Sequence, residues 1–307
     1  MGMSSMYMVI GVVPSEYGGV KERAFFVAVL SSVCQFGPFS TMPISAVFCQ
    51  SSVRWPGAYY FFGVSTIVSL LVFFVMYKEG SATSRAPSTA KVLSAEDQDQ
   101  DACDEFVPYK RIFTTLSTYG IISSAFGDSL AYKVFILYGP IYMNKVIHFD
   151  VESTGLFASM PYIFALMANF LSTCFVQKCH CVGMPAKILT LATVTQIIGC
   201  VSLITLTFLS TDGPMVAVFL YTMALTLNSV HFVNQMTTVQ IVGGKYAYVI
   251  ISVISAQTSL FGLALPPIVS LMAPNHTAAE WAHVFYYVVG AVAVTSFICR
   301  LDEDTTS

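Results

Sequence analysis

The chain has 307 residues, of which 55% are apolar and only 10% are charged, and its formal net charge is −3. A soluble domain carries about 25% charged residues. This composition excludes an ordinary soluble protein, and the small net charge, which is spread over several loops, indicates no nucleic-acid partner.

Long runs without Asp, Glu, Lys or Arg divide the chain. Each run supplies the roughly 20 apolar residues that cross a bilayer as a helix. The runs are continuous and lack the period of two that marks barrel strands, so helices are expected. They cover residues 24–53, 55–77, 153–177, 188–211, 213–244, 246–279 and 281–299, and residues 112–138 are similar apart from Asp128 and Lys133. The sequence therefore predicts an all-α membrane protein with about eight transmembrane helices.

The first 13 residues are apolar but too short to span a bilayer. Pro14, Ser15 and Glu16 follow them in place of a small-residue cleavage site, and the segment has no basic n-region, so a signal peptide is not indicated. This segment is interpreted as the end of a span whose beginning is missing.

The segment 78–107 differs in kind, because it is polar and its second half is acidic. Asp97, Asp99 and Asp101 have the spacing of early calcium-loop ligands, but Ala102 and Pro108 stand where the turn glycine and the last acidic ligand belong. The segment is therefore predicted to be a cytoplasmic acidic linker. Residues 179–181, Cys-His-Cys, lack a partner cluster for zinc, so no metal and no cofactor are predicted.

Basic residues indicate the orientation, because Lys and Arg concentrate on the cytoplasmic side of membrane spans. With the linker inside, alternating spans place only Arg54 and Lys145 outside. Inside are Lys21, Arg23, Lys78, Arg85, Lys91, Lys110, Arg111, Lys178, Lys187, Lys245 and Arg300. The tail, residues 301–307, is then cytoplasmic.

Ionisable groups within membrane spans are expensive and are candidates for function. Asp128 and Lys133 lie in the span 112–138, and His231 lies in the span 213–240. Lys133 is near the outer end of its span, where it could instead reach the headgroups. His231 could relay protons or could be a neutral, hydrogen-bonded histidine.

Two polar stripes include two of these residues, Asp128 and His231. Asp128 shares a helical face with Ser124 and Tyr132, and His231 shares one with Asn228 and Gln235. Such stripes either line a shared hydrated path or hold helices together by hydrogen bonds. We take Asp128, Tyr132, Lys133, Asn228, His231 and Gln235 as the predicted substrate and ion pathway.

Two stretches far apart in the chain repeat one pattern. A charged residue, an apolar run with Phe-Gly and Pro, and a Trp that opens another apolar run occur from Lys21 to Gly63 and again from Lys245 to Gly290. This repeat is typical of transporters built from two similar halves. The matching bends of rocking helices are expected at Gly37, Pro38, Pro43, Gly262, Pro266 and Pro267.

The sequon Asn275-His276-Thr277 lies in a loop that the topology places outside. It is a short loop close to the membrane, so Asn275 is a candidate for glycosylation but could equally be a chance match.

These features together resemble the major facilitator superfamily, and within it the anion transporters of solute carrier family 17. The matching stretches include Lys21-Glu22-Arg23, Gln35-Phe36-Gly37, Met42-Pro43-Ile44-Ser45, Arg54-Trp55-Pro56, Tyr59-Tyr60, Val107-Pro108-Tyr109, Gly139-Pro140-Ile141-Tyr142, His148-Phe149-Asp150, Thr154-Gly155, Met160-Pro161-Tyr162, Glu280-Trp281 and Val284-Phe285-Tyr286. Sialin, the vesicular glutamate transporters and the sodium-phosphate cotransporters form this group.

The resemblance implies twelve spans, of which this chain would hold the fifth to the twelfth. Residues 1–77 would then be the remnant of the N-terminal bundle, 78–107 the linker, 108–300 the six-helix C-terminal bundle and 301–307 the tail. The glutamate branch has an Arg near the position of Asp128, so an acid there argues against glutamate as the substrate.

The expected function is H⁺- or Na⁺-coupled secondary active transport of small organic or inorganic anions by alternating access, in a chain that is a fragment of a full-length transporter. The expected partners are the lipid bilayer, the anion and the ion, in the plasma membrane or in a vesicle or lysosome membrane. Two alternatives stay open: a truncated, non-transporting regulatory partner, and a membrane-embedded enzyme using His231.

Overall fold

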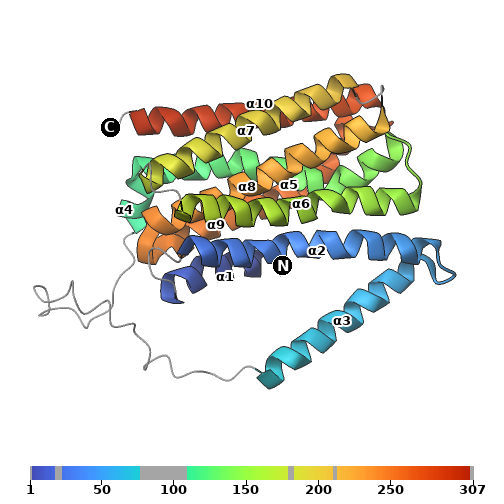
Figure 1. The fold of residues 1–307 in the computed structure, drawn as a ribbon, viewed down its shortest axis with the longest axis horizontal. Coiled ribbons are helices and arrows are strands. Elements are labelled where there is room, and N and C mark those ends of the chain that lie inside the picture. The colour runs from blue at the N-terminus through green and yellow to red at the C-terminus, as the bar shows by residue number, and fades with distance from the viewer. Residues whose placement is uncertain (1, 18–22, 77–108, 179–182, 210–212, 305–307) are drawn as a thin grey trace, which may run out of the picture.

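The computed structural model describes residues 2–17, 23–76, 109–178, 183–209 and 213–304, and these residues form helices joined by short loops (Figure 1). No strand occurs in these ranges. The helices are α1 (Gly2–Tyr17), α2 (Arg23–Gln50), α3 (Arg54–Met76), α4 (Tyr109–Thr114), α5 (Leu116–Lys145), α6 (Val151–Lys178), α7 (Met184–Leu209), α8 (Pro214–Gly243), α9 (Ala247–Met272) and α10 (Ala278–Asp304). The short 3₁₀ turn η2 (Gly244–Tyr246) joins α8 to α9.

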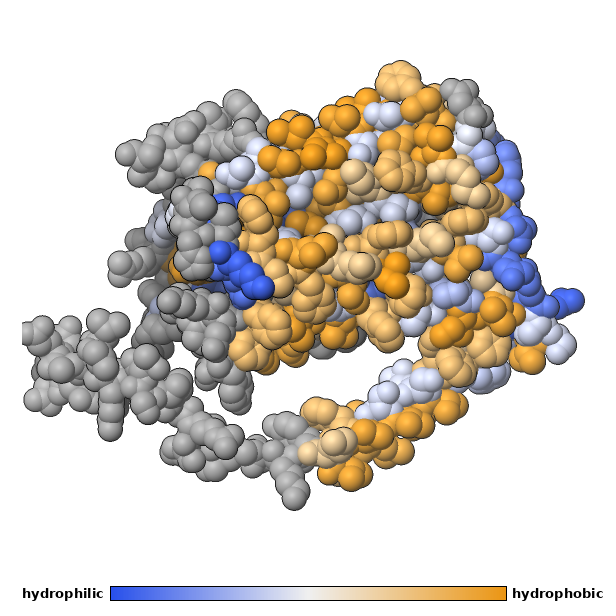
Figure 2. All heavy atoms as spheres, viewed as in Figure 1, coloured by the Kyte–Doolittle hydropathy of each residue, from blue (hydrophilic) through white to orange (hydrophobic). Residues whose placement is uncertain are grey.

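Seven of the described helices are long and apolar enough to cross a membrane: α2, α3 and α5 to α9. Helix α10 runs alongside them and occupies the position of the eighth predicted span. Apolar residues cover the middle of the visible face, and strongly hydrophilic residues gather toward the ends of the helices (Figure 2). This distribution fits a bundle whose sides face lipid, so the prediction of an all-α, multi-pass membrane protein is confirmed.

Successive long helices run in opposite directions, so their ends form two groups (Figure 1). The loops after α2, α5, α7 and α9 lie at one end of the bundle, which we call the Arg54 end because Arg54 begins α3 there. The beginnings of α2, α5, α7 and α9 lie at the opposite end, called the Lys187 end after the residue in the first turn of α7. The alternation used for the predicted orientation is present in the fold.

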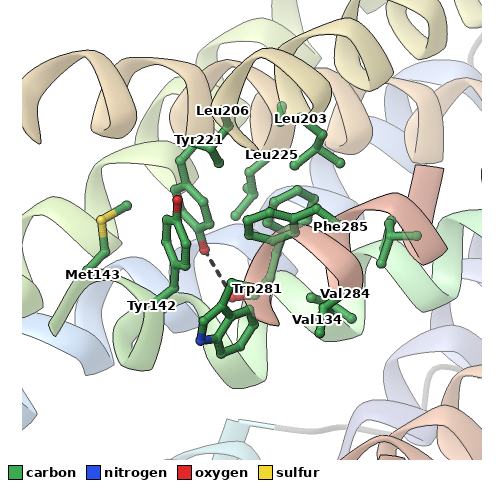
Figure 3. Packing of buried hydrophobic residues seen from close by; sticks show 14 of the residues in the cluster. Val134, Tyr142, Met143, Leu203, Leu206, Tyr221, Leu225, Trp281, Val284 and Phe285 are labelled. Carbon is green, nitrogen blue, oxygen red and sulfur yellow. Dashed lines mark hydrogen bonds between the residues drawn. The ribbon is translucent and has the colours of Figure 1, made fainter. Parts of the chain in front are cut away.

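Helices α5 to α10 pack around an aromatic core (Figure 3). Tyr221 of α8 donates a hydrogen bond from its hydroxyl to the carbonyl oxygen of Phe135 in α5, at 3.1 Å. The rings of Tyr142, Trp281 and Phe285 pack edge-on or tilted against one another, with centroids 5.2 to 6.0 Å apart. This core fixes α5 and α8 side by side, and both carry predicted pathway residues.

The N-terminal helices pack on this bundle in different ways. Helix α2 lies along α6, and the two helices approach closely at Gly155, where an added Cβ would overlap the side chain of Ala46. Helix α1 lies against α9 and α2. Helix α3 diverges from the other helices and contacts chiefly α2 (Figure 1).

The predicted runs and the observed helices differ mainly at α5. The predicted span 112–138 begins at Leu116, because Thr115 has an extended backbone that separates α5 from α4, and it continues to Lys145. Gly139 and Pro140 do not end it, as is common for helices within lipid. The residues predicted to bend helices lie inside α2 and α9, which are each continuous, so bending stays a prediction.

Several predictions fall on residues that the structure does not describe. They are the linker 78–107, the cluster Cys179-His180-Cys181 and the last three residues of the tail. The backbone of residues 301–304 continues α10. The assignment of domain boundaries therefore stays a prediction.

Candidate functional site

Asp128 lies in the middle of α5 and is 3% exposed. Its neighbour Gly127 packs directly on α10, where an added Cβ would be 3.0 Å from the Cα of Val292. A buried carboxylate needs partners for both oxygens, since an unpaired charge in a low-dielectric environment is strongly destabilising. The structure supplies these partners from three helices.

His231 of α8 is one of the two closest partners. Its Nε2 lies 2.9 Å from Oδ2 of Asp128, and its Nδ1 lies 3.1 Å from the carbonyl oxygen of Ala192 in α7. The Nε2 contact is short, but it does not meet the geometry of a hydrogen bond, and it becomes an ion pair when the ring is protonated. His231 is itself buried and thus joins α5, α7 and α8.

Three neutral side chains complete the surroundings of the carboxylate. Gln196 of α7 donates from Nε2 to Oδ1 at 2.9 Å, and Gln235 of α8 donates to Oδ2 at 3.3 Å. The Ser124 hydroxyl, one turn earlier in α5, makes a long contact of 3.5 Å with Oδ2. Every one of these groups is a donor, and an ionised carboxylate is acceptor-only.

Two hollows adjoin this cluster, which we call the Asp128 cluster (Ser124, Asp128, Gln196, His231 and Gln235). A small one of about 30 Å³ has room for a water molecule and is lined by Asp128, Gln196 and His231 together with Asn228. A larger one of about 580 Å³ lies between α5, α7, α8 and α10 and reaches Ser124, Gln196, His231 and Gln235. Its other lining residues include Ser117 and Ile188, which lie in the first turns of α5 and α7 at the Lys187 end.

The structure separates the six predicted pathway residues into two groups. Asp128, His231 and Gln235 are in the Asp128 cluster, and Asn228 lies at its small hollow. Lys133 lies on another side of α5, where its Nζ is 3.7 Å from the place of an added Cβ on Gly262 of α9. The Tyr132 hydroxyl is buried, and no hydrogen-bond partner for it is found in the described part of the chain.

Sequence reasoning missed Gln196, although it contacts Asp128 as closely as any residue. It is a single amide within the charge-free run 188–211, and its only signal was polarity in an apolar segment. The backbone carbonyl of Ala192, four residues earlier, carries no signal in the sequence at all.

A second buried polar contact, also missed, joins α2 to the C-terminal helices. Gln35 of α2 donates to the Ser229 hydroxyl of α8 at 2.8 Å, and Asn169 of α6 donates to the same oxygen at 3.0 Å. All three side chains are buried. This contact lies between α2 and the pair α6 and α8, and so connects segments on the two sides of the undescribed linker.

The predicted glycosylation site lies in the loop between α9 and α10, at the Arg54 end. The Asn275 side chain is exposed and donates to Glu280 at 3.1 Å. Glu280 also accepts from the backbone N–H of Thr277 at 3.1 Å, and Thr277 accepts from the N–H of Glu280 at 3.4 Å, which is the reciprocal pattern of a capping box. Desolvation raises the pKa of Glu280, but hydrogen bonds from Thr277 and Asn275 outweigh it, so that this pKa lies below its ordinary value.

Comparison with known proteins gives consistent results. The family model described as Major Facilitator Superfamily matches residues 1–248. Sialin of Homo sapiens is 22% identical over 298 residues, which are 92% of this chain and 59% of sialin, and sialin of Ovis aries is 21% identical over 97% of this chain and 62% of its own length. Sodium-dependent phosphate transport protein 1 of Homo sapiens is 25% identical over 154 residues, 49% of this chain and 33% of that protein.

The chain thus spans about three fifths of the length of the sialins that it matches almost throughout. The resemblance to the sialin and sodium-phosphate group of solute carrier family 17 is confirmed by these relatives. Because the family model covers most of the chain and the fold is an antiparallel membrane bundle, this chain belongs to the Major Facilitator Superfamily.

Proposed function

We propose that this chain is part of a secondary active transporter that moves small anions across a membrane by alternating access, coupled to H⁺ or Na⁺. The observation that carries the proposal is the Asp128 cluster, a buried ionisable group that three membrane helices surround with polar side chains next to a cavity. Ionisable groups in such positions mark ion and substrate pathways. The names of the relatives, sialin and a sodium-dependent phosphate transport protein, favour an anionic solute.

Membership of a transporter family decides against the membrane-embedded enzyme. The regulatory-partner alternative stays open and has a distinct signature: such a chain would co-purify with a full-length relative and show no uptake alone. The membrane that holds the protein, plasma membrane or a vesicle or lysosome membrane, also stays a proposal.

Uptake into proteoliposomes tests the proposed function. Vesicles with the purified chain are loaded so that either a pH gradient or a Na⁺ gradient is present, and radiolabelled phosphate and sialic acid are offered outside. Gradient-driven accumulation of either anion above protein-free vesicles supports transport. Uptake that is equal with and without protein under both gradients contradicts it for this chain.

A further inference from the structure

We propose that Asp128 and His231 form a site that holds one exchangeable proton, and that H⁺ rather than Na⁺ is therefore the coupling ion. This inference rests on the proposed function for its role in transport, but the presence of the proton is a separate property of the structure. It follows from the partners of the two ring nitrogens of His231.

The first ring nitrogen has a fixed role. Nδ1 of His231 lies 3.1 Å from the carbonyl oxygen of Ala192. A backbone carbonyl accepts hydrogen bonds and cannot donate them. Nδ1 must therefore carry a hydrogen, which defines the tautomer if the ring is neutral.

The second ring nitrogen then determines the proton count. If the ring were neutral, Nε2 would carry a lone pair and no hydrogen at 2.9 Å from Oδ2 of Asp128, and two electron-rich atoms at that distance repel each other. A second ring hydrogen, or a hydrogen on the carboxyl group, removes the repulsion. The pair therefore holds one proton more than a neutral histidine beside an ionised aspartate.

The neighbours of the carboxylate suit this proton better than a sodium ion. Gln196 and Gln235 present N–H groups to the two oxygens, and His231 presents a ring nitrogen. A sodium site is built from oxygen ligands such as unwound backbone carbonyls. Donors that surround an ionised carboxylate leave it as an acceptor and place the proton on His231.

No other charged side chain of the described residues competes for this role at the cluster. Among the residues that line the two hollows, on α5, α7, α8 and α10, the titratable ones are Asp128, His231 and Cys200. Lys133 faces α9, and Tyr132 lies near Tyr162 of α6. The charge of the site is thus set by Asp128 and His231, and with one proton the pair is neutral.

The large hollow supplies a route for this proton. It touches His231 and Gln235 at its inner part and extends to Ser117 and Ile188 at the Lys187 end, with Thr193 and Thr238 along its wall. Loss of the proton would leave a buried carboxylate beside a neutral ring, which is unfavourable unless water enters or the helices move apart. Release is therefore expected to accompany a rearrangement of α5 against α7 and α8.

The test counts the proton directly, on the full 307-residue chain in lipid nanodiscs. Nitrogen-15 NMR of labelled histidine reports the hydrogens on the His231 ring, and infrared difference spectroscopy reports whether Asp128 is a protonated carboxyl. Near neutral pH we expect two ring hydrogens on His231 and an ionised Asp128. One ring hydrogen together with a protonated Asp128 places the same proton on the other partner and also supports the site, whereas one ring hydrogen beside an ionised Asp128 overturns it.

Variants test whether the NMR and infrared signals come from the pair Asp128 and His231. Asp128→Asn removes the acid, so His231 should keep only the Nδ1 hydrogen near neutral pH; a ring that keeps both hydrogens contradicts the pairing. If this variant does not fold, His231→Gln is the second one, and there a protonated carboxyl band should arise from Asp128, whose absence contradicts the proposal. His148→Gln, at an exposed histidine in the loop after α5, is the matched control and should leave both signals unchanged.

Transport measurements separate the two proposals. If a pH gradient drives anion uptake and Asp128→Asn abolishes that dependence, both proposals are supported. If the proton is present but no anion is taken up under any gradient, the site stands and the proposed function fails. If a Na⁺ gradient alone drives uptake, the proposed function stands and the assignment of H⁺ as the coupling ion is overturned.

Discussion

Gly139 of α5 leaves the space that the hydroxyl of Tyr221 occupies. A methyl group at this position would overlap the hydroxyl oxygen and lie 3.0 Å from Cζ. The hydroxyl is held in place by its hydrogen bond to Phe135, so it has little freedom to retreat. We expect Gly139→Ala to lower the free energy of unfolding by about 1–3 kcal/mol, the usual range for overpacking, as measured by thermal or denaturant unfolding in detergent.

Two further variants show whether this hydroxyl is the cause. Tyr221→Phe removes the overlapping atom, so the double variant Gly139→Ala/Tyr221→Phe should be more stable than Gly139→Ala alone. Gly290→Ala is the control, because an added Cβ there meets nothing within 4 Å. If Gly290→Ala lowered the free energy of unfolding as much as Gly139→Ala, overlap with the Tyr221 hydroxyl would not explain the effect at Gly139.

Glu280 makes the beginning of α10 sensitive to acid in a defined direction. Its folded-state pKa lies below the ordinary 4.5, so the capping hydrogen bonds are fully present above that pH and are lost as the pH falls through the lowered value. Hydrogen exchange at Thr277 and Glu280, corrected for the intrinsic pH dependence of exchange, should stay slow at the ordinary pKa and become faster only below it.

The matched variant for this prediction is Glu280→Gln, which keeps an acceptor oxygen but has no carboxyl group to titrate. Its exchange at the first turn of α10 should show no acid-dependent step. If the native protein lost protection well above the ordinary pKa of glutamate, the hydrogen-bonded loop of Asn275, Thr277 and Glu280 would not be the capping structure described.

At the scale of whole helices, α1 and α8 are joined by a hydrogen bond that compensates for a proline. Pro14 has no N–H to bond the carbonyl oxygen of Ile10, four residues earlier. Gln240 of α8, which is fully buried, donates its Nε2 to that oxygen at 2.7 Å. We expect Gln240→Leu to lower the free energy of unfolding by about 1–3 kcal/mol, because a buried carbonyl loses its donor.

Pro14→Ala in the Gln240→Leu background provides the reciprocal test. Alanine restores the backbone N–H at position 14, so part of the lost stability should return in the double variant, measured by the same unfolding assay. If Gln240→Leu lowered the free energy of unfolding equally in the native background and in the Pro14→Ala background, the lost hydrogen bond to the carbonyl of Ile10 would not be the cause.

The sequence predicts the helices well because charged residues mark their ends. The charge-free runs 213–244 and 55–77 correspond closely to α8 and α3. The sequence predicts poorly which helices pack together, because the packing of two helices leaves little trace in the residues of either one. Asp128 and His231 were each recognisable as buried ionisable residues, but nothing in the two polar stripes required α5 and α8 to place them 2.9 Å apart, or α7 to add Gln196.

At the scale of the whole molecule, the two ends of the bundle should face different compartments. Lys178 and Lys187 lie at one end, and the Lys187 side chain donates to the carbonyl oxygen of Val176 at 3.2 Å, which ties the end of α6 to the beginning of α7. Lys145 and Asn275 lie at the opposite end (Figure 1). The excess of basic residues predicts that the Lys187 end is cytoplasmic.

Single cysteines labelled in sealed cells with a membrane-impermeant thiol reagent test this orientation. In a background without native cysteines, Lys145→Cys and Asn275→Cys should react from outside, whereas Lys178→Cys and Lys187→Cys should react only after the membrane is permeabilised. If Lys145 and Lys187 reacted from the same side, the threading of α5 to α7 through the bilayer would be wrong. The large hollow, which extends to Ile188 beside Lys187, would then not open toward the cytoplasm, and the proton of the Asp128 cluster would need another route.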